Sequence, residues 1–232
     1  MSHQPVSNPS DSTLELYSDE YHRRLADPGE SFSAHYAAEY TRLVHPVAGE
    51  SVLEIGCASG RTSELLLERG LDVTGIDFDA RACDSSRERL ERFGDRSRVV
   101  CASADAITDF SPYDKVLMLD FVEHVDDALL TRILDNMRSK YDGPVYVYTP
   151  NLFHPYEWAQ RLHLVSGDPT HINVKPWWRW ISFFEAHGMR VVRLEPATSH
   201  PRWLAAIERP LLRVPLLNRI FIRSIGLELA FR

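Results

Sequence analysis

The sequence has few of the features that mark secreted, membrane-spanning or nucleic-acid-binding proteins. Its 232 residues include only three cysteines, Cys57, Cys83 and Cys101, without CxxC spacing, so neither a disulfide framework nor a structural zinc site is expected. There is no apolar run long enough to cross a bilayer, and the N-terminus lacks an apolar signal core. The formal net charge of -7 argues against a protein that neutralises nucleic-acid phosphates. These absences predict a cytoplasmic protein with no nucleic-acid partner.

What remains is the composition of an ordinary globular protein, with 44% apolar and 25% charged residues. Residues 1–13 are rich in Ser, Pro and Asn, which predicts a flexible leader. Within residues 14–50, the segments 14–27 and 33–45 carry apolar residues at helical spacing, and Asp27-Pro28-Gly29 separates them. Two helices are therefore expected before a main domain over residues 51–232.

The main domain alternates strand-like and helix-like segments. Apolar runs predict strands at 51–55, 72–77, 97–102, 115–119, 144–149, 189–195 and 227–232, and helical patterns lie at 61–69, 79–93, 126–140 and 176–187. Strands that alternate with helices indicate a mostly parallel sheet covered on both faces. The expected fold is a doubly wound α/β fold with seven strands, the last of them antiparallel.

The turn after the first expected strand is the most informative motif. Ser51-Val-Leu-Glu-Ile-Gly-Cys-Ala-Ser-Gly60 runs from a strand into a helix, and such a turn can hold a ligand. A dinucleotide-binding GxGxxG motif that starts at Gly56 would need glycine where Ala58 and Arg61 stand. No Lys-Ser/Thr pair follows, so a nucleoside-triphosphate loop is also excluded. The remaining pattern is ExGxxxG, formed by Glu54, Gly56 and Gly60.

Together with an acid at the end of the second strand, this pattern resembles the class I S-adenosylmethionine-dependent methyltransferases. The resemblance covers roughly residues 50–150 and implies the Rossmann-like methyltransferase fold with S-adenosyl-L-methionine as cofactor. In that family the acid at the position of Asp77 accepts hydrogen bonds from the ribose hydroxyls, and the next residue, Phe78, packs on the adenine. Glycine is commoner in the family at the position of Ala58, and only a slight adjustment of the turn is expected from alanine.

Two later motifs extend the resemblance. Ala104-Asp105-Ala106 stands where the family places a carboxylate near the adenine amino group, and Asp120 with Phe121 lies in the loop beneath the methionine moiety. The residue types agree with the cofactor's chemistry, because a sulfonium with a ribose diol needs carboxylates and turn amides rather than phosphate-binding cations. The predicted cofactor-binding residues are Glu54, Gly56, Cys57, Ala58, Gly60, Asp77, Phe78, Asp105, Ala106, Asp120 and Phe121.

Structural roles are the alternative for several of these residues. Asp105 and Asp120 are also suited to cap helices, and Phe78 to fill the core. Three histidines are candidates for the general base that deprotonates an acceptor hydroxyl, in the order His171, His124 and His154. Each of them can instead be a packing or surface residue. No metal site is assigned, because no pair of candidate ligands has diagnostic spacing. A metal that assists through Asp120, His124, Asp168 or His171 remains an alternative, and the sequence does not decide whether a divalent metal is required.

The region after residue 150 is expected to recognise the acceptor. Segment 151–180 is long for a connection and rich in aromatic residues, so it is predicted to cover the acceptor. Residues 200–222 form an insertion rich in Arg and Leu, which either packs on the domain or contacts an anionic membrane.

The predicted function is O-methylation of a small hydroxylated acceptor, a sugar or a secondary metabolite. The alternatives are an N-methyltransferase, a methyltransferase of a lipid-linked substrate with peripheral membrane contact, and a non-catalytic cofactor-binding scaffold. The sequence does not indicate an oligomeric state.

Overall fold

The computed structural model describes residues 29–165, 168–198, 202–214 and 216–232. The predicted leader 1–13 and the predicted helix at 14–27 lie outside these residues. The second predicted helix is present as α3 (Gly29–Val44), which starts four residues earlier than expected. Its start directly after Pro28 agrees with a break at Asp27-Pro28-Gly29.

Seven strands form one sheet in the order β3-β2-β1-β4-β5-β7-β6. They are β1 (Ser51–Ile55), β2 (Asp72–Asp77), β3 (Ser97–Cys101), β4 (Lys115–Leu119), β5 (Val145–Pro150), β6 (Met189–Ala197) and β7 (Ser224–Phe231). The first five strands pair with one another in parallel, whereas β7 is antiparallel to both β5 and β6. The predicted fold class is therefore confirmed, including the antiparallel last strand. That strand begins three residues earlier than predicted, at Ser224.

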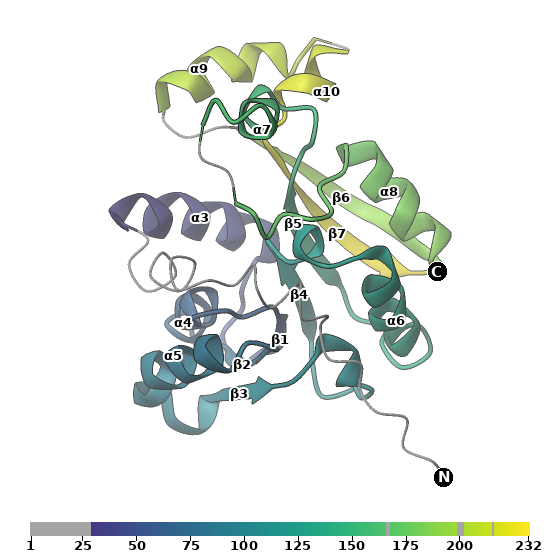
Figure 1. The fold of residues 1–232 in the computed structure, drawn as a ribbon. Coiled ribbons are helices and arrows are strands. Elements are labelled where there is room, and N and C mark those ends of the chain that lie inside the picture. Colours follow the sequence, from purple (N-terminus) through teal and green to yellow (C-terminus); the bar gives the residue numbers. More distant parts are fainter. Residues whose placement is uncertain (1–28, 166–167, 199–201, 215) are drawn as a thin grey trace.

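Helices cover both faces of the sheet (Figure 1). One face carries α3, α4 (Arg61–Leu67) and α5 (Ala80–Leu90), and the other carries α6 (Asp127–Arg138) and α8 (Trp177–Ala186). Strand β5 shows why both faces are apolar: Val145 and Val147 point into the core beneath α6 and α8, and Tyr146 and Tyr148 point into the core beneath α3. Burial on both faces explains the uninterrupted apolar runs of the central strands.

Short polar signals start the helices. The Asp79 side chain accepts hydrogen bonds from the first turn of α5, and the Asp126 side chain accepts one from Leu129 N in α6. Helix α7 (Pro155–Arg161) was not predicted, although proline at its first position and His154 as its N-cap are helix-start signals. The aromatic segment 151–180 thus contains α7 and the start of α8.

A group of three helices lies at the carboxyl ends of β5 and β6. It consists of α7 and of the two helices of the 200–222 insertion, α9 (Arg202–Leu211) and α10 (Leu217–Phe221). Figure 1 shows these helices together at one end of the molecule. Asn151 joins the end of β5 to the end of α10, because its side-chain amide donates to the carbonyls of Arg219 and Ile222. Among the described residues, no helix is long and apolar enough to cross a membrane.

Candidate active site

The loop between β1 and α4 has an unusual backbone that two glycines permit. Gly56, Ala58 and Gly60 all have positive φ, at 81°, 45° and 76°. A Cβ on Gly56 would lie 2.6 Å from the Phe121 ring, and one on Gly60 would lie 2.5 Å from Ser86 Oγ. Glycine is thus required at both positions, by conformation and by close packing. Helix α5 occupies the space beside Gly60. This glycine therefore also allows close packing of α5, a role that the sequence did not reveal.

Asp77 lies at the end of β2 and is held by this loop. Its two carboxylate oxygens accept hydrogen bonds from Ala58 N at 2.9 Å and from Asp79 N at 3.0 Å. Burial raises the pKa of Asp77, and the backbone hydrogen bonds act in the opposite direction. Because Ala58 keeps the left-handed backbone and donates to Asp77, its replacement of the commoner glycine leaves the turn intact. Phe78 next to it is half-buried.

Glu54 and Cys57 lie deeper in the same region. The Glu54 side chain is 3% exposed and accepts a hydrogen bond from the Ser63 hydroxyl of α4. Burial raises the pKa of Glu54 to about 8, and the hydrogen bonds from Ser63 and Thr62 partly offset this rise. Cys57 is also buried, and burial raises the pKa of its thiol, so it is unreactive. Glu54 is thus a buried acid at the end of a strand, beside the glycine loop.

Asp105 is already engaged by protein groups. Ser103 Oγ donates to one carboxylate oxygen at 2.5 Å, and Arg132 Nε donates to the other at 2.8 Å. Burial alone would raise the pKa of Asp105, but the hydrogen bonds from Ser103 and Arg132 outweigh it and lower the pKa below its ordinary value. Ala106 is exposed. The structure therefore gives Asp105 an ion-pair partner that links the loop after β3 to α6.

Asp120 follows β4 and contacts a residue of α3. Its backbone has φ of 49°, and the hydroxyl of Tyr40 donates to its carboxylate. Tyr40 also packs against Tyr148 of β5, with ring centroids 5.2 Å apart. Burial raises the pKa of both Asp120 and Tyr40. Phe121, which is 9% exposed, lies beneath Gly56 and joins this loop to the loop after β1.

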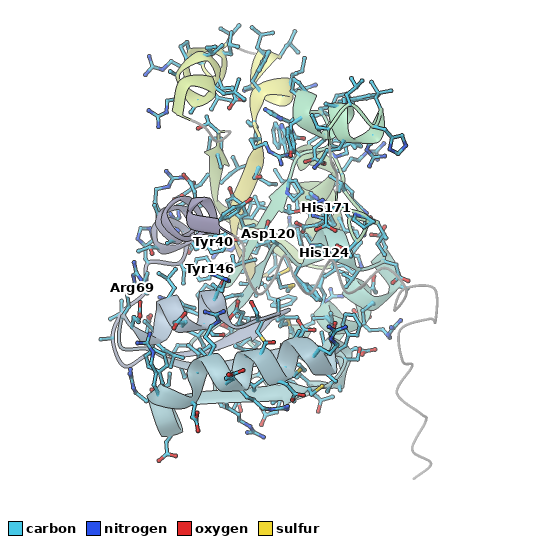
Figure 2. The ribbon with its side chains drawn as sticks, turned by 60° about the vertical axis from the view of Figure 1, so that its left-hand side comes forward. Tyr40, Arg69, Asp120, His124, Tyr146 and His171 are labelled. Atoms are coloured by element: carbon cyan, nitrogen blue, oxygen red, sulfur yellow. The ribbon has the colours of Figure 1, made fainter. Side chains whose placement is uncertain are left out.

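Three potential catalytic groups come together beyond Asp120. Glu123, His124 and His171 each place one side-chain nitrogen or oxygen within 4.8 Å of the other two. The two imidazole rings meet edge to face with centroids 4.8 Å apart. Figure 2 shows Asp120 between Tyr40 and this pair of histidines. The structure thus unites two of the three predicted histidines with the predicted Asp120, and it adds Glu123 and Tyr40.

The segment that carries His171 is tied to the turn that carries Glu123. Asn173 N donates to Glu123 O at 2.9 Å, and the Asn173 side-chain amide donates to Val125 O at 2.8 Å. Thr170 Oγ1 lies 2.8 Å from His124 Nδ1. Burial lowers the pKa of His124 to about 4, so this imidazole is neutral at physiological pH.

His154 has a different environment from the other two histidines. Its Nε2 lies 3.0 Å from Glu208 Oε1 of α9, and its Nδ1 accepts a hydrogen bond from Tyr156 N. It is 2% exposed, and burial lowers its pKa. Both ring nitrogens are thus used to cap α7 and to attach α9. Of the three candidate bases, His154 is the one whose ring the structure uses to hold helices in place.

Comparisons with known proteins find similar domains. Residues 52–140 match the family described as "Methyltransferase domain". A ubiquinone biosynthesis O-methyltransferase of Nitrosospira multiformis is 31% identical over 135 residues, which cover 55% of this chain and 56% of that protein. A protein of the same name from Azoarcus sp. is 29% identical over 152 residues, or 62% and 65% of the two chains. The matches therefore span less than two thirds of either relative.

Solved structures support the fold. A S-adenosylmethionine-dependent methyltransferase from Archaeoglobus fulgidus superposes with a TM-score of 0.65 at 22% identity, covering 93% of this chain and all of that chain. Residues 52–140 thus resemble a methyltransferase domain, and the chain has the fold of this S-adenosylmethionine-dependent methyltransferase, as predicted. The matched family region ends at residue 140, before His154 and His171.

Proposed function

We propose that the protein transfers the methyl group of S-adenosyl-L-methionine to the hydroxyl oxygen of a small acceptor in the cytoplasm. The observation that carries this proposal is that Glu123 and His124, which follow Asp120 in the loop after β4, lie together with His171 from the segment between α7 and α8. The acceptor oxygen attacks the methyl carbon of the sulfonium in a single displacement, so placing the two reactants supplies much of the rate. A group that removes the hydroxyl proton supplies most of the remainder.

Each side of the site has a separate role in this proposal. The glycine loop with Glu54 and Asp77 binds the cofactor, and the segment that begins at Asn151 and includes His171 covers the acceptor. His171 Nδ1 is buried and has no hydrogen-bond partner among the described residues, so it is available to a ligand. A cofactor-binding scaffold without activity would not need such a group, which favours an enzyme over a scaffold.

The decisive experiment is a transfer assay. Purified protein is incubated with S-adenosylmethionine that carries a labelled methyl group and a panel of sugars, phenols and other hydroxylated metabolites, with amines as the comparison. A labelled methyl ether identified by mass supports O-methylation. Labelled amines alone would replace it by N-methylation, and cofactor binding without any transfer would favour the scaffold.

The cofactor half of the proposal predicts a large effect at Asp77. Replacing Asp77 with alanine is expected to weaken S-adenosylhomocysteine binding by about 1–3 kcal/mol, because the ribose diol loses a charged acceptor. Calorimetry measures the affinity, with Asp77→Asn to preserve the turn's shape and Asp84→Ala on the exposed side of α5 as control. Unchanged affinity in a folded Asp77→Ala protein would remove Asp77 from the cofactor site.

One surface favours a lipid-linked acceptor. Large apolar side chains are exposed on and around α7, α9 and α10, with Leu162 at 62% and Leu164 at 73%. Others are Tyr156, Trp158, Ile207 and Leu216. Among the described side chains of these helices and of the connection between α9 and α10, the exposed charges are arginines, namely Arg161, Arg209, Arg213 and Arg219. The two acids, Glu157 and Glu208, are buried. The names of the two relatives, which refer to ubiquinone biosynthesis, point in the same direction.

An apolar surface bordered by arginines fits an anionic bilayer. We therefore expect the full chain to sediment with vesicles that contain phosphatidylglycerol and much less with phosphatidylcholine vesicles. The double variant Leu162→Ser/Leu164→Ser should reduce sedimentation at least severalfold. Val47→Ser, an equally exposed site away from these helices, is the matched control. If the double variant and the parent sediment equally, this surface does not bind the vesicles, and the argument for a lipid-linked acceptor fails.

A further inference from the structure

Buried polar atoms of the Glu123, His124 and His171 cluster have no partner in the described part of the chain. These atoms are Glu123 Oε1 and His171 Nδ1, and the whole Glu123 side chain is 0% exposed. Burying a polar group without a hydrogen bond destabilises a protein, so such atoms call for a partner such as a bound ion, a water or a ligand. The cluster also places three ligand atoms within 4.8 Å of one another.

The hydrogen bonds of Thr170 fix the tautomer of His124. Asp168 Oδ1 can only accept, so the Thr170 hydroxyl donates its single proton to it, at 2.5 Å. Thr170 Oγ1 must then accept from His124 Nδ1–H, at 2.8 Å. The lone pair of His124 is left on Nε2. A second hydrogen bond that orients an imidazole in this way is typical of histidines that bind metals.

The neighbouring side chains leave one oxygen of the cluster open. Asp120 adds a second acidic side chain beside that of Glu123. Arg223 acts on Asp120, but its guanidinium is bonded to Glu157. The Tyr40 hydroxyl donates to Asp120 and the Thr149 hydroxyl donates to one oxygen of Glu123, so the other oxygen, Glu123 Oε1, is the one left for a ligand.

We propose that Glu123, His124 and His171 bind one divalent cation, and that this cation holds the acceptor hydroxyl during methyl transfer. Two imidazoles with a carboxylate suit transition ions such as Mn²⁺, Co²⁺ or Zn²⁺ better than Ca²⁺. Three protein ligands leave positions open for the acceptor oxygen. The binding of the ion stands on the cluster alone, and only its role in catalysis rests on the proposed O-methylation.

With the cation bound, the proton of the acceptor hydroxyl and the electron pair of the broken C–S bond each have a destination. A hydroxyl bound to a divalent cation releases its proton to solvent more readily than a free one. Its oxygen then forms the C–O bond to the methyl carbon while the C–S bond breaks. The sulfonium sulfur keeps the electron pair and becomes the neutral thioether of S-adenosylhomocysteine. In the metal-bound form the imidazole lone pairs are coordinated, so neither histidine acts as the base.

The test is a titration of the untagged full chain, stripped with EDTA, with Mn²⁺ followed by electron paramagnetic resonance. One bound ion per chain is expected. His171→Ala and Glu123→Gln should each weaken binding at least tenfold. His163→Asn, which changes an exposed histidine outside the cluster, should bind like the parent. His124→Gln serves as a further variant where Glu123→Gln does not fold, as judged by circular dichroism.

The outcomes separate this inference from the proposed function. Saturable binding that the cluster variants weaken supports the site, even if no acceptor is found. Absence of saturable binding, or equal affinity in folded His171→Ala and His124→Gln proteins, would overturn it. Methyl transfer that continues undiminished in excess EDTA would also overturn the catalytic role, leave O-methylation standing and return His171 to the role of a proton acceptor.

Discussion

Replacing His171 with alanine is expected to slow methyl transfer by about 10²–10⁴-fold, the usual loss when an acid–base group is removed. The expectation holds whether His171 accepts the hydroxyl proton or binds a cation that lowers the pKa of the hydroxyl. In both cases the imidazole acts on the acceptor. Affinity for S-adenosylhomocysteine should stay nearly unchanged, because Glu54 and Asp77 lie at the ends of other strands, β1 and β2.

The measurement is kcat at saturating cofactor, with calorimetry of S-adenosylhomocysteine on the same preparations. His154→Asn is an informative comparison, because both ring nitrogens of His154 are used in contacts with Glu208 and Tyr156. It should lower Tm while the folded protein turns over at nearly the parent rate. A loss of less than tenfold in His171→Ala would leave positioning of an already nucleophilic acceptor as the source of the rate.

The fold could be predicted because its determinants are local in the sequence. Strands buried on both faces, such as β4 and β5, need uninterrupted apolar residues. The turn after β1 needs residues that tolerate positive φ, and Gly56 and Gly60 supply them. Each of these signals lies within a few residues of the element that it specifies. Helix α7 was missed because its aromatic sequence has weak periodicity, although Pro155 marked its start.

The candidate site could be predicted only in part, because several of its contacts join distant residues. The Tyr40 hydroxyl reaches Asp120 from a helix 80 residues earlier, and nothing in the spacing of α3 identifies that contact. Arg132 pairs with Asp105 across 27 residues and so takes a carboxylate that the sequence assigned to adenine. Such pairings depend on how α3 and α6 pack on the sheet.

The absence of diagnostic spacing was a weak argument against a metal site. Glu123 and His124 are adjacent in a tight 3-10 turn, and His171 comes from a segment that Asn173 fastens to that turn. Spacing rules apply to ligands that share one helix or one loop, whereas these ligands come from two loops at the carboxyl edge of the sheet. For this cluster, the informative signal is the pair of unpartnered atoms on Glu123 and His171, which only the structure reveals.

The second large effect is expected at Glu54, where burial raises the pKa from 4.5 to about 8. The folded protein therefore holds a proton on Glu54 that the unfolded chain has already released at neutral pH. Stability from this group is fully present below about pH 4.5 and is lost as the pH rises to about 8. One pKa unit corresponds to about 1.4 kcal/mol, so above pH 8 the free energy of unfolding is lowered through Glu54 by at most about 5 kcal/mol.

Glu54→Gln should remove this loss, because glutamine has no charge to desolvate and its amide oxygen can still accept from Ser63. Urea unfolding between pH 5 and 9 is expected to show the variant increasingly more stable than the parent toward high pH, and similar near pH 5. Glu88→Gln, exposed on α5, should follow the parent throughout. Above about pH 8, where Glu54 is ionised and its carboxylate attracts the cationic cofactor, the variant should also bind S-adenosylmethionine more weakly than the parent. Stability curves that run parallel at all pH values would show that Glu54 is not a strained acid, and unchanged cofactor affinity would show that its charge does not serve binding.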